Sequence, residues 1–243
     1  MDDLIFIATI LLITTVSGGL LAYLIKFQAA NLRLPLVFAG SFLFAVTIIH
    51  ILPEIFTVSE APMQIGIWVL LGFFLQQLLE TFTSGVEHGH FHEDQVTTQK
   101  SRYSLLIALM IHSLLEGALL THESPFHDQH ESYSLILGIV FHKMPAAFAL
   151  MAAVRTSGKI AARDLVILLL FSLASPIGLV FSNYILTISE DNLLVLFALV
   201  SGNFLHISTT IFVETSPNHN LGWRRTLASA IGATMAILVE FFS

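Results

Sequence analysis

The stretch that decides the fold runs from residue 103 to residue 121 and reads YSLLIALMIHSLLEGALLT. A helix needs roughly 20 predominantly apolar residues to cross the hydrocarbon core of a bilayer, and this run has that length. Yet it carries His112 and Glu116 in its interior. An ionisable side chain near the bilayer centre costs on the order of 2.5–3.5 kcal/mol, so both residues are candidate functional positions.

The composition of the whole chain indicates that its solvent is lipid. Of its 243 residues, 55% are hydrophobic and 11% are charged, and the mean hydropathy is +0.82. A soluble domain carries roughly 25% charged residues, so soluble, disordered and fibrous classes are excluded. The net charge of -7 argues against a nucleic-acid partner, which requires a basic surface. The absence of cysteine excludes disulfides and thiolate metal sites.

Apolar runs of spanning length, bounded by polar clusters, occur eight times along the sequence. The first begins at Leu4 with no basic residue before it, which favours a membrane span over a cleaved signal peptide. We therefore expect an all-α integral membrane protein, an eight-helix bundle forming one transmembrane domain over residues 1–243. The predicted spans are about 4–25, 34–56, 63–84, 103–121, 133–154, 164–187, 193–214 and 225–242.

The basic residues predict the orientation of the bundle. Nine of the ten Lys and Arg residues lie in the loops that follow the first, third, fifth and seventh spans. Because positive residues stay on the cytoplasmic side, both termini are expected to be extracellular, in a multi-pass protein of a plasma or bacterial inner membrane. The tenth, Lys143, lies inside the predicted fifth span.

Two loops contain several histidines. The predicted cytoplasmic loop between the third and fourth spans has three of them at alternating positions, beside carboxylates: His88, His90 and His92. Such a tract favours weak, exchangeable metal binding. The predicted extracellular loop between the fourth and fifth spans has three without regular spacing: His122, His127 and His130. For either loop, a solvated connection with incidental histidines is the alternative interpretation.

The fourth and fifth spans together predict a metal site. His112 and Glu116 are four residues apart, so they project from one helical face. His142 lies at a similar depth in the fifth span, near the middle of the membrane. If the two helices face each other, two imidazoles and a carboxylate converge there. Zinc, iron and manganese all accept this set of ligands, although each histidine taken alone is equally well explained by packing.

Further polar residues outline a path through the bundle. Pro145 lacks an N–H and frees a carbonyl near residue 141, and transporters place ion sites at such interrupted helices. His50 and Glu54 lie toward the extracellular end of the second span and form the predicted entry. The predicted exit comprises Glu80, His206, Glu214 and the loop histidines His88, His90 and His92. A plain packing kink is the alternative for Pro145, and a helix cap or an interhelical hydrogen bond is the alternative for each polar residue taken singly.

These motifs resemble the Zrt/Irt-like (ZIP) family of divalent-metal transporters. The resemblance covers nearly the whole chain and rests chiefly on His112-Ser113-x-x-Glu116-Gly117, His142-Lys143 with Ala147-Phe148-Ala149-Leu150, and His50-x-x-Pro53-Glu54. It implies that His112, Glu116 and His142 are metal ligands, with Ser113 a weaker one. Many members bind a second metal through acids at positions where this chain has Lys143 and Ala146. This departure implies a single-metal site in which Lys143 pairs with Glu116 when the metal leaves.

The resemblance also implies an activity, namely import of a divalent transition metal into the cytoplasm. Zn²⁺ is expected first and Fe²⁺ or Mn²⁺ next, each as transported substrate, and no cofactor is expected. The resemblance also implies that one helix bundle of the protein moves against the other during transport. Assembly into a homodimer is implied as well. An intramembrane zinc-dependent hydrolase is the main alternative, because two His, one Glu and a bound water meet the minimum for zinc catalysis. A cation-regulated signalling or scaffold protein is a third possibility.

Overall fold

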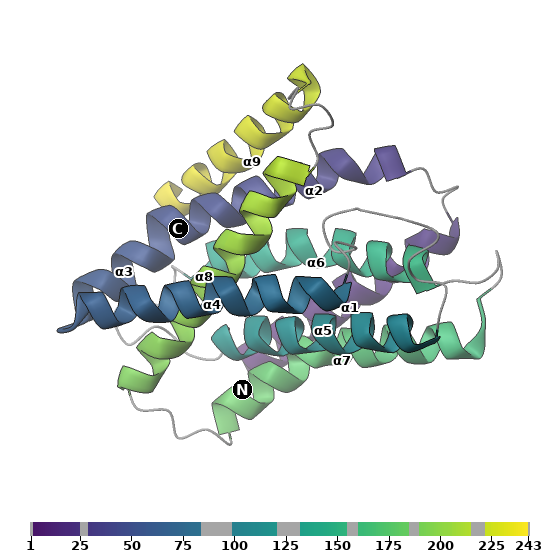
Figure 1. Ribbon diagram of the computed structural model, residues 1–243, viewed down its shortest axis with the longest axis horizontal. Helices are drawn as coiled ribbons and strands as arrows, with labels where there is room; N and C mark the ends of the chain where they lie inside the picture. The colour runs from purple at the N-terminus through teal and green to yellow at the C-terminus, as the bar shows by residue number, and fades with distance from the viewer. Residues whose placement is uncertain are drawn as a thin grey trace.

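The computed structural model is all-helical (Figure 1) and describes residues 2–24, 29–83, 99–120, 132–154, 160–184, 190–214 and 222–242. A short π-helix, η1, joins α2 to α3, so these three elements form one continuous rod. The elements are α1 (Asp2–Leu24), α2 (Ala29–Val46), η1 (Thr47–Ile51), α3 (Leu52–Val58), α4 (Pro62–Thr83), α5 (Gln99–Leu119), α6 (Ser132–Val154), α7 (Ala162–Tyr184), α8 (Glu190–Glu214) and α9 (Trp223–Phe242).

Seven helical stretches among the described residues are long and apolar enough to cross a membrane. They are Leu4–Leu24, Leu34–Val58, Pro62–Thr81, Ser134–Ala152, Ala162–Tyr184, Asn192–Ile211 and Trp223–Phe242. The predicted span at 103–121 falls on α5, in which the apolar stretch among the described residues is the shorter segment Leu105–Leu119. The prediction of an integral membrane helical bundle is confirmed.

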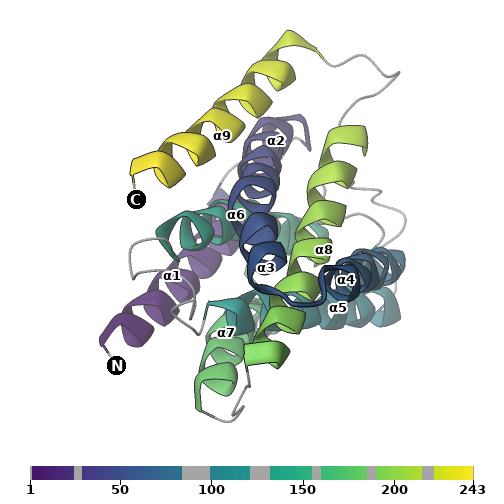
Figure 2. The ribbon, with the colours of Figure 1, turned by 90° about the vertical axis from the view of Figure 1, so that its left-hand side faces the viewer.

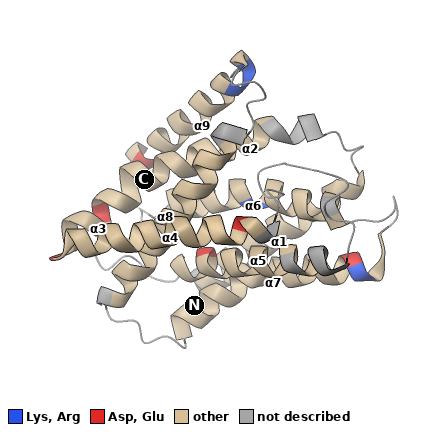
Figure 3. Ribbon diagram, in the orientation of Figure 1, with Lys and Arg blue, Asp and Glu red and all other residues tan. Residues whose placement is uncertain are grey.

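The outer surface of the bundle is apolar. On α4 the side chains of Leu70, Phe74 and Leu78 are exposed, and on α9 those of Ile231 and Leu238 are exposed. Figure 3 shows that most of the ribbon carries neither acidic nor basic residues. Exposed apolar surface of this extent would aggregate in water, so it is suited to contact with lipid.

The helices pack as two groups (Figures 1 and 2). In the first group, α5 packs against α7, and α1 packs against both α6 and α7. In the second group, α4 packs against α8, and α2 packs against α9 and α8. Gly117 of α5 and Gly178 of α7 allow the closest approach in the first group, since a Cβ on either would overlap the backbone of the other helix. Small residues serve this purpose widely in membrane proteins.

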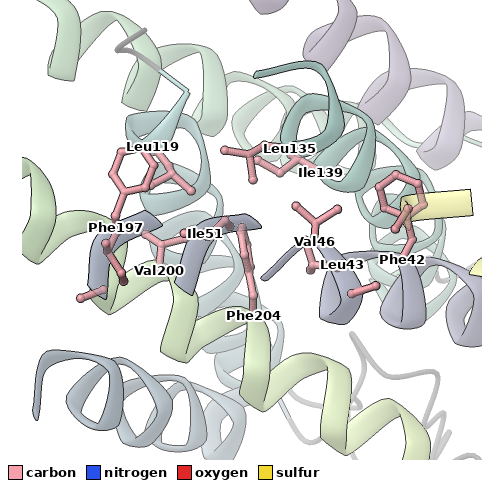
Figure 4. Packing of buried hydrophobic residues seen from close by; sticks show 14 of the residues in the cluster. Phe42, Leu43, Val46, Ile51, Leu119, Leu135, Ile139, Phe197, Val200 and Phe204 are labelled. Atoms are coloured by element: carbon pink, nitrogen blue, oxygen red, sulfur yellow. The ribbon is translucent and has the colours of Figure 1, made fainter. Parts of the chain in front are cut away.

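The two groups meet across an apolar interface. Figure 4 shows Phe42 and Val46 of α2, Ile51 of η1, Ile139 of α6 and Phe204 of α8 within one buried cluster. Aromatic rings contribute at the same place, where α2 and α6 meet. There the ring of Phe42 lies edge-on to that of Phe141, with centroids 5.3 Å apart. Because α5 and α6 lie at this interface, polar side chains on their inner faces are enclosed between the groups.

Candidate metal centre

The core of the candidate site is formed on α5. Leu, Ala and Met, all strong helix formers, surround His112 and Glu116, and the helical spacing places these two side chains one turn apart. The distance from His112 Nε2 to Glu116 Oε1 is 2.9 Å. Both side chains are almost completely buried, at 4% and 1% exposed. The predicted pairing of an imidazole and a carboxylate on one face is therefore present.

His142 of α6 completes a cluster of three potential ligands. Each of His112, Glu116 and His142 offers a ligand atom within 4.8 Å of the other two, and among the described residues no other three such side chains meet this mutual distance. The two imidazole rings are nearly perpendicular, with centroids 5.8 Å apart. Ligand atoms on one tetrahedral zinc lie roughly 3.3 Å apart for bonds of about 2.0 Å. The three-ligand cluster therefore needs only a small contraction to hold one ion.

The environment of His142 itself favours a cation. Both ring nitrogens are buried, and neither has a hydrogen-bond partner among the described residues. A buried polar atom left unsatisfied costs about 1–3 kcal/mol, so such atoms require an explanation. A metal ion bound to one nitrogen would remove that cost. The imidazole is thus suited to a ligand role rather than to packing.

Lys143 lies beside the three-ligand cluster. Its ammonium group is 2.6 Å from Glu116 Oε2 and 3.0 Å from Ser113 Oγ, and it lies over the ring of Phe171 at 5.5 Å from the centroid. Glu116 therefore contacts His112 with one oxygen and Lys143 with the other. Ala146, also buried, adds no ligand atom. The ammonium group of Lys143 thus lies where, by the family resemblance, acidic residues of other members would bind a second metal.

Ser113 and Pro145 have local roles. Ser113 accepts a hydrogen bond from Lys143 at its hydroxyl and another from Ser175 of α7 at its carbonyl, the latter at 2.7 Å. The hydroxyl, predicted as a weak ligand, is thus already engaged by the ammonium group. Pro145 does not interrupt α6, which runs continuously from Ser132 to Val154. The broken helix considered from the sequence is therefore not present.

One contact to the three-ligand cluster comes from the second group of helices. The side-chain amide nitrogen of Asn203, on α8, lies 3.3 Å from His112 Nδ1, and Asn203 is 1% exposed. Asn203 lies within the predicted span 193–214, but the sequence alone did not assign it to the site. No local spacing links it to His112, because the two residues are brought together only by helix packing.

The predicted entry residues lie in a second cluster, formed by His50, Glu54 and Glu240. His50 is on η1, where the N–H of Leu52 bonds to the carbonyl of Thr47 in the wider π-helical pattern. Its Nδ1 is 2.5 Å from Glu240 Oε1 on α9, and its Nε2 is 3.6 Å from Glu54 Oε2. Sequence reasoning missed Glu240, although an acid within a predicted span was an available signal.

Two of the predicted exit residues form a pair, Glu80 and His206. Glu80 Oε2 of α4 is 2.5 Å from His206 Nε2 of α8. The imidazole also lies edge-on to Phe73, with centroids 4.8 Å apart. The remaining predicted exit positions, the side chain of Glu214 and the loop residues His88, His90 and His92, lie outside the described residues, as do His122, His127 and His130.

Taken together, the fold and the cluster define a polytopic membrane protein with a buried His, Glu and His set suited to a divalent metal. A sequence model of the family described as ZIP Zinc transporter matches residues 90–240. That region is more than half of the chain, which therefore belongs to the ZIP zinc transporter family. The family consists of transporters, so the alternative of an intramembrane zinc-dependent hydrolase is set aside.

Individual relatives agree with this assignment. The chain is 31% identical over 146 residues to Protein zntD of Dictyostelium discoideum, an alignment that covers 55% of this chain and 21% of that protein. It is 25% identical over 119 residues to Zinc transporter ZIP9 of Xenopus tropicalis, covering 49% and 39%. It is 26% identical over 113 residues to Zinc transporter ZIP9 of Micropogonias undulatus, covering 46% and 36%. The chain thus spans well under two thirds of each of these relatives.

Proposed function

We propose that this protein imports a divalent transition metal ion into the cytoplasm, with Zn²⁺ the first candidate and Fe²⁺ or Mn²⁺ next. The observation that carries the proposal is the buried cluster of His112, Glu116 and His142, in which both ring nitrogens of His142 lack hydrogen-bond partners among the described residues. On a membrane bundle of the ZIP family, this cluster is the transport site. The metal is the transported substrate.

The orientation follows from the distribution of basic residues. Eight helices cross the membrane, both termini are extracellular, and the loop with His88, His90 and His92 is cytoplasmic. α5 serves as the fourth span because its 21 residues rise about 30 Å, enough to cross the hydrocarbon core with its basic first turn at the interface. The cell membrane and a homodimeric assembly remain part of the proposal on the strength of the charge pattern and the family, respectively.

The path begins at the His50 cluster. When Glu240 accepts a hydrogen bond from Nδ1 of His50, the lone pair of Nε2 faces Glu54, and a cation fits between that nitrogen and the carboxylate. The ion then passes to the three-ligand cluster. Release follows past Glu80 and His206 to Glu214 and the cytoplasmic loop.

Lys143 limits the site to one metal and weakens its hold. The ammonium group neutralises Glu116 while the site is empty. When a dication binds His112, His142 and the other carboxylate oxygen, Lys143 remains nearby and repels it. Two like charges at such distances interact by several kcal/mol even at an effective dielectric constant of about 20. The repulsion keeps the ion exchangeable, as a transport cycle requires.

A flux measurement tests the proposal. Sealed proteoliposomes with a zinc-sensitive dye inside are expected to show saturable entry, lost in His112→Ala and in Glu116→Ala. Ser201→Ala is the matched control, since its buried hydroxyl bonds, within the described part of the chain, to the carbonyl of Phe197 on its own helix. Full uptake in both ligand variants would contradict the site. Absence of uptake by the unmodified protein for zinc, iron and manganese would contradict the function.

A further inference from the structure

The contact between Asn203 and His112 has a chemical consequence for the transport site. A neutral imidazole carries one hydrogen, on either Nδ1 or Nε2. In the empty site, the amide nitrogen of Asn203 lies 3.3 Å from His112 Nδ1, and because this nitrogen can only donate, Nδ1 must carry a lone pair and accept the hydrogen bond. The single hydrogen of the ring is then on Nε2, which lies 2.9 Å from a carboxylate oxygen of Glu116.

Metal binding reverses this arrangement. An ion held by Nε2 of His112 needs the lone pair of that nitrogen, so the hydrogen must be on Nδ1. The amide nitrogen of Asn203 would then face a donor. The other atom of the same amide, Oδ1, is buried without a hydrogen-bond partner among the described residues. Rotation of the amide by half a turn presents this oxygen to the Nδ1 hydrogen.

We propose that Asn203 is a positioning residue that holds His112 in one tautomer when the site is empty and in the other when a metal is bound. An amide can do both because it has a donor and an acceptor on one planar group. Carboxylate or carbonyl partners on a metal-binding imidazole support the metal-bound tautomer alone. The inference rests on the proposed function for its metal-bound half, whereas its empty-state half stands on the contact itself.

The position of Asn203 makes the contact a link between the two helix groups. His112 belongs to α5 in the first group, and Asn203 belongs to α8 in the second. When a metal binds the site, the side-chain amide of Asn203 therefore rotates by half a turn, and the contact between the two helix groups is retained. A leucine of similar size would fill the same space with no preference between tautomers.

The test compares the unmodified protein with Asn203→Leu and Asn203→Asp by ¹⁵N-histidine NMR in lipid bilayers. The spectra are recorded without metal at about pH 8, above the ordinary imidazole pKa of about 6.5. The signal of His112, among the 11 histidines, is identified by its loss in His112→Ala. We expect the Nε2–H tautomer in the unmodified protein, a mixture of tautomers in Asn203→Leu and the Nδ1–H tautomer in Asn203→Asp.

Zinc binding and uptake complete the test. Zinc should shift His112 of the unmodified protein to the Nδ1–H tautomer. Asn203→Asp should lower both KM and kcat of uptake, and Asn203→Leu should raise KM, each by about tenfold, the lower end of what outer partners of a metal ligand contribute. An unchanged His112 tautomer in both variants would overturn the inference and reduce Asn203 to a packing residue. Because the metal-free spectra involve no transport, that outcome is distinct from a failure of zinc uptake.

Discussion

The three-ligand cluster and the His50 cluster use the same side-chain types with different charge balances. In the His50 cluster, one imidazole lies between two carboxylates, Glu54 and Glu240. In the three-ligand cluster, a single carboxylate is shared between His112 and Lys143, so its charge is already neutralised. On the proposed function, the first arrangement is suited to capturing cations, whereas the second is suited to an ion that coordinates both imidazoles. The two clusters are therefore proposed to serve different steps, capture and selective passage.

The largest effect is expected when Glu116 is changed to Gln. This substitution leaves the ammonium group of Lys143 buried without its carboxylate, and breaking a buried ion pair costs about 3–5 kcal/mol. Both thermal stability and zinc uptake should be lost. The double variant Glu116→Gln with Lys143→Met removes both charges and should recover stability, measured by thermal unfolding in detergent, without recovering uptake. Recovery of uptake in the double variant would show that Glu116 is not a ligand.

A second effect concerns His142, which should be needed for the metal and dispensable for folding. His142→Ala breaks no hydrogen bond of the ring among the described residues, so the protein without metal should retain most of its stability. A ligand at 100 times its dissociation constant stabilises by about 2.7 kcal/mol, and this zinc-dependent stabilisation should disappear. Thermal unfolding with and without zinc measures both. A zinc-dependent shift equal to that of the unmodified protein would remove His142 from the site.

Replacing Lys143 makes the central charge balance resemble that of the His50 cluster. Lys143→Asn removes a positive charge within 2.6 Å of Glu116, so zinc should bind about tenfold tighter and leave more slowly. Uptake should then show a lower KM and a lower kcat.

Anomalous scattering from zinc-soaked crystals should show one strong peak in the unmodified protein. Two peaks about 4 Å apart, the spacing of two-metal sites, would contradict the single-metal assignment.

The smallest effect is expected at Glu240, which contacts the candidate entry ligand His50. Glu240→Gln keeps an acceptor but removes one charge of the His50 cluster. We expect KM for zinc uptake to rise several-fold with kcat unchanged, because capture weakens while passage through the three-ligand cluster does not. Glu54→Gln, which alters the facing carboxylate, should have the larger effect. A fall in kcat without a change in KM would place Glu240 outside the capture step.

Much of the site was accessible from the sequence because its key relationships are local. The i, i+4 spacing of His112 and Glu116 and the depth of His142 follow from helix geometry and from the length of a span. The family followed from the same motifs and is confirmed by the match over residues 90–240. The ligand roles of these residues, and the direction of transport, stay predictions.

The remaining contacts depend on which helices are neighbours. Asn203 reaches His112, and Glu240 reaches His50, across large separations in the chain. No periodicity within a single span encodes such pairs. Among these remaining contacts, the pairing of Lys143 with Glu116 was predicted, and that prediction came from the family resemblance rather than from the spacing of residues.

By itself the sequence determined that this protein is a helical membrane protein, because a chain with so few charges cannot be solvated by water. It also determined which polar side chains are carried into the membrane. The tertiary structure alone decided that α5 and α6 turn their polar faces into one enclosed space against α8. The reason is physical: helices in lipid form independently, but their association is set by close packing and interhelical hydrogen bonds, which join residues remote in the chain.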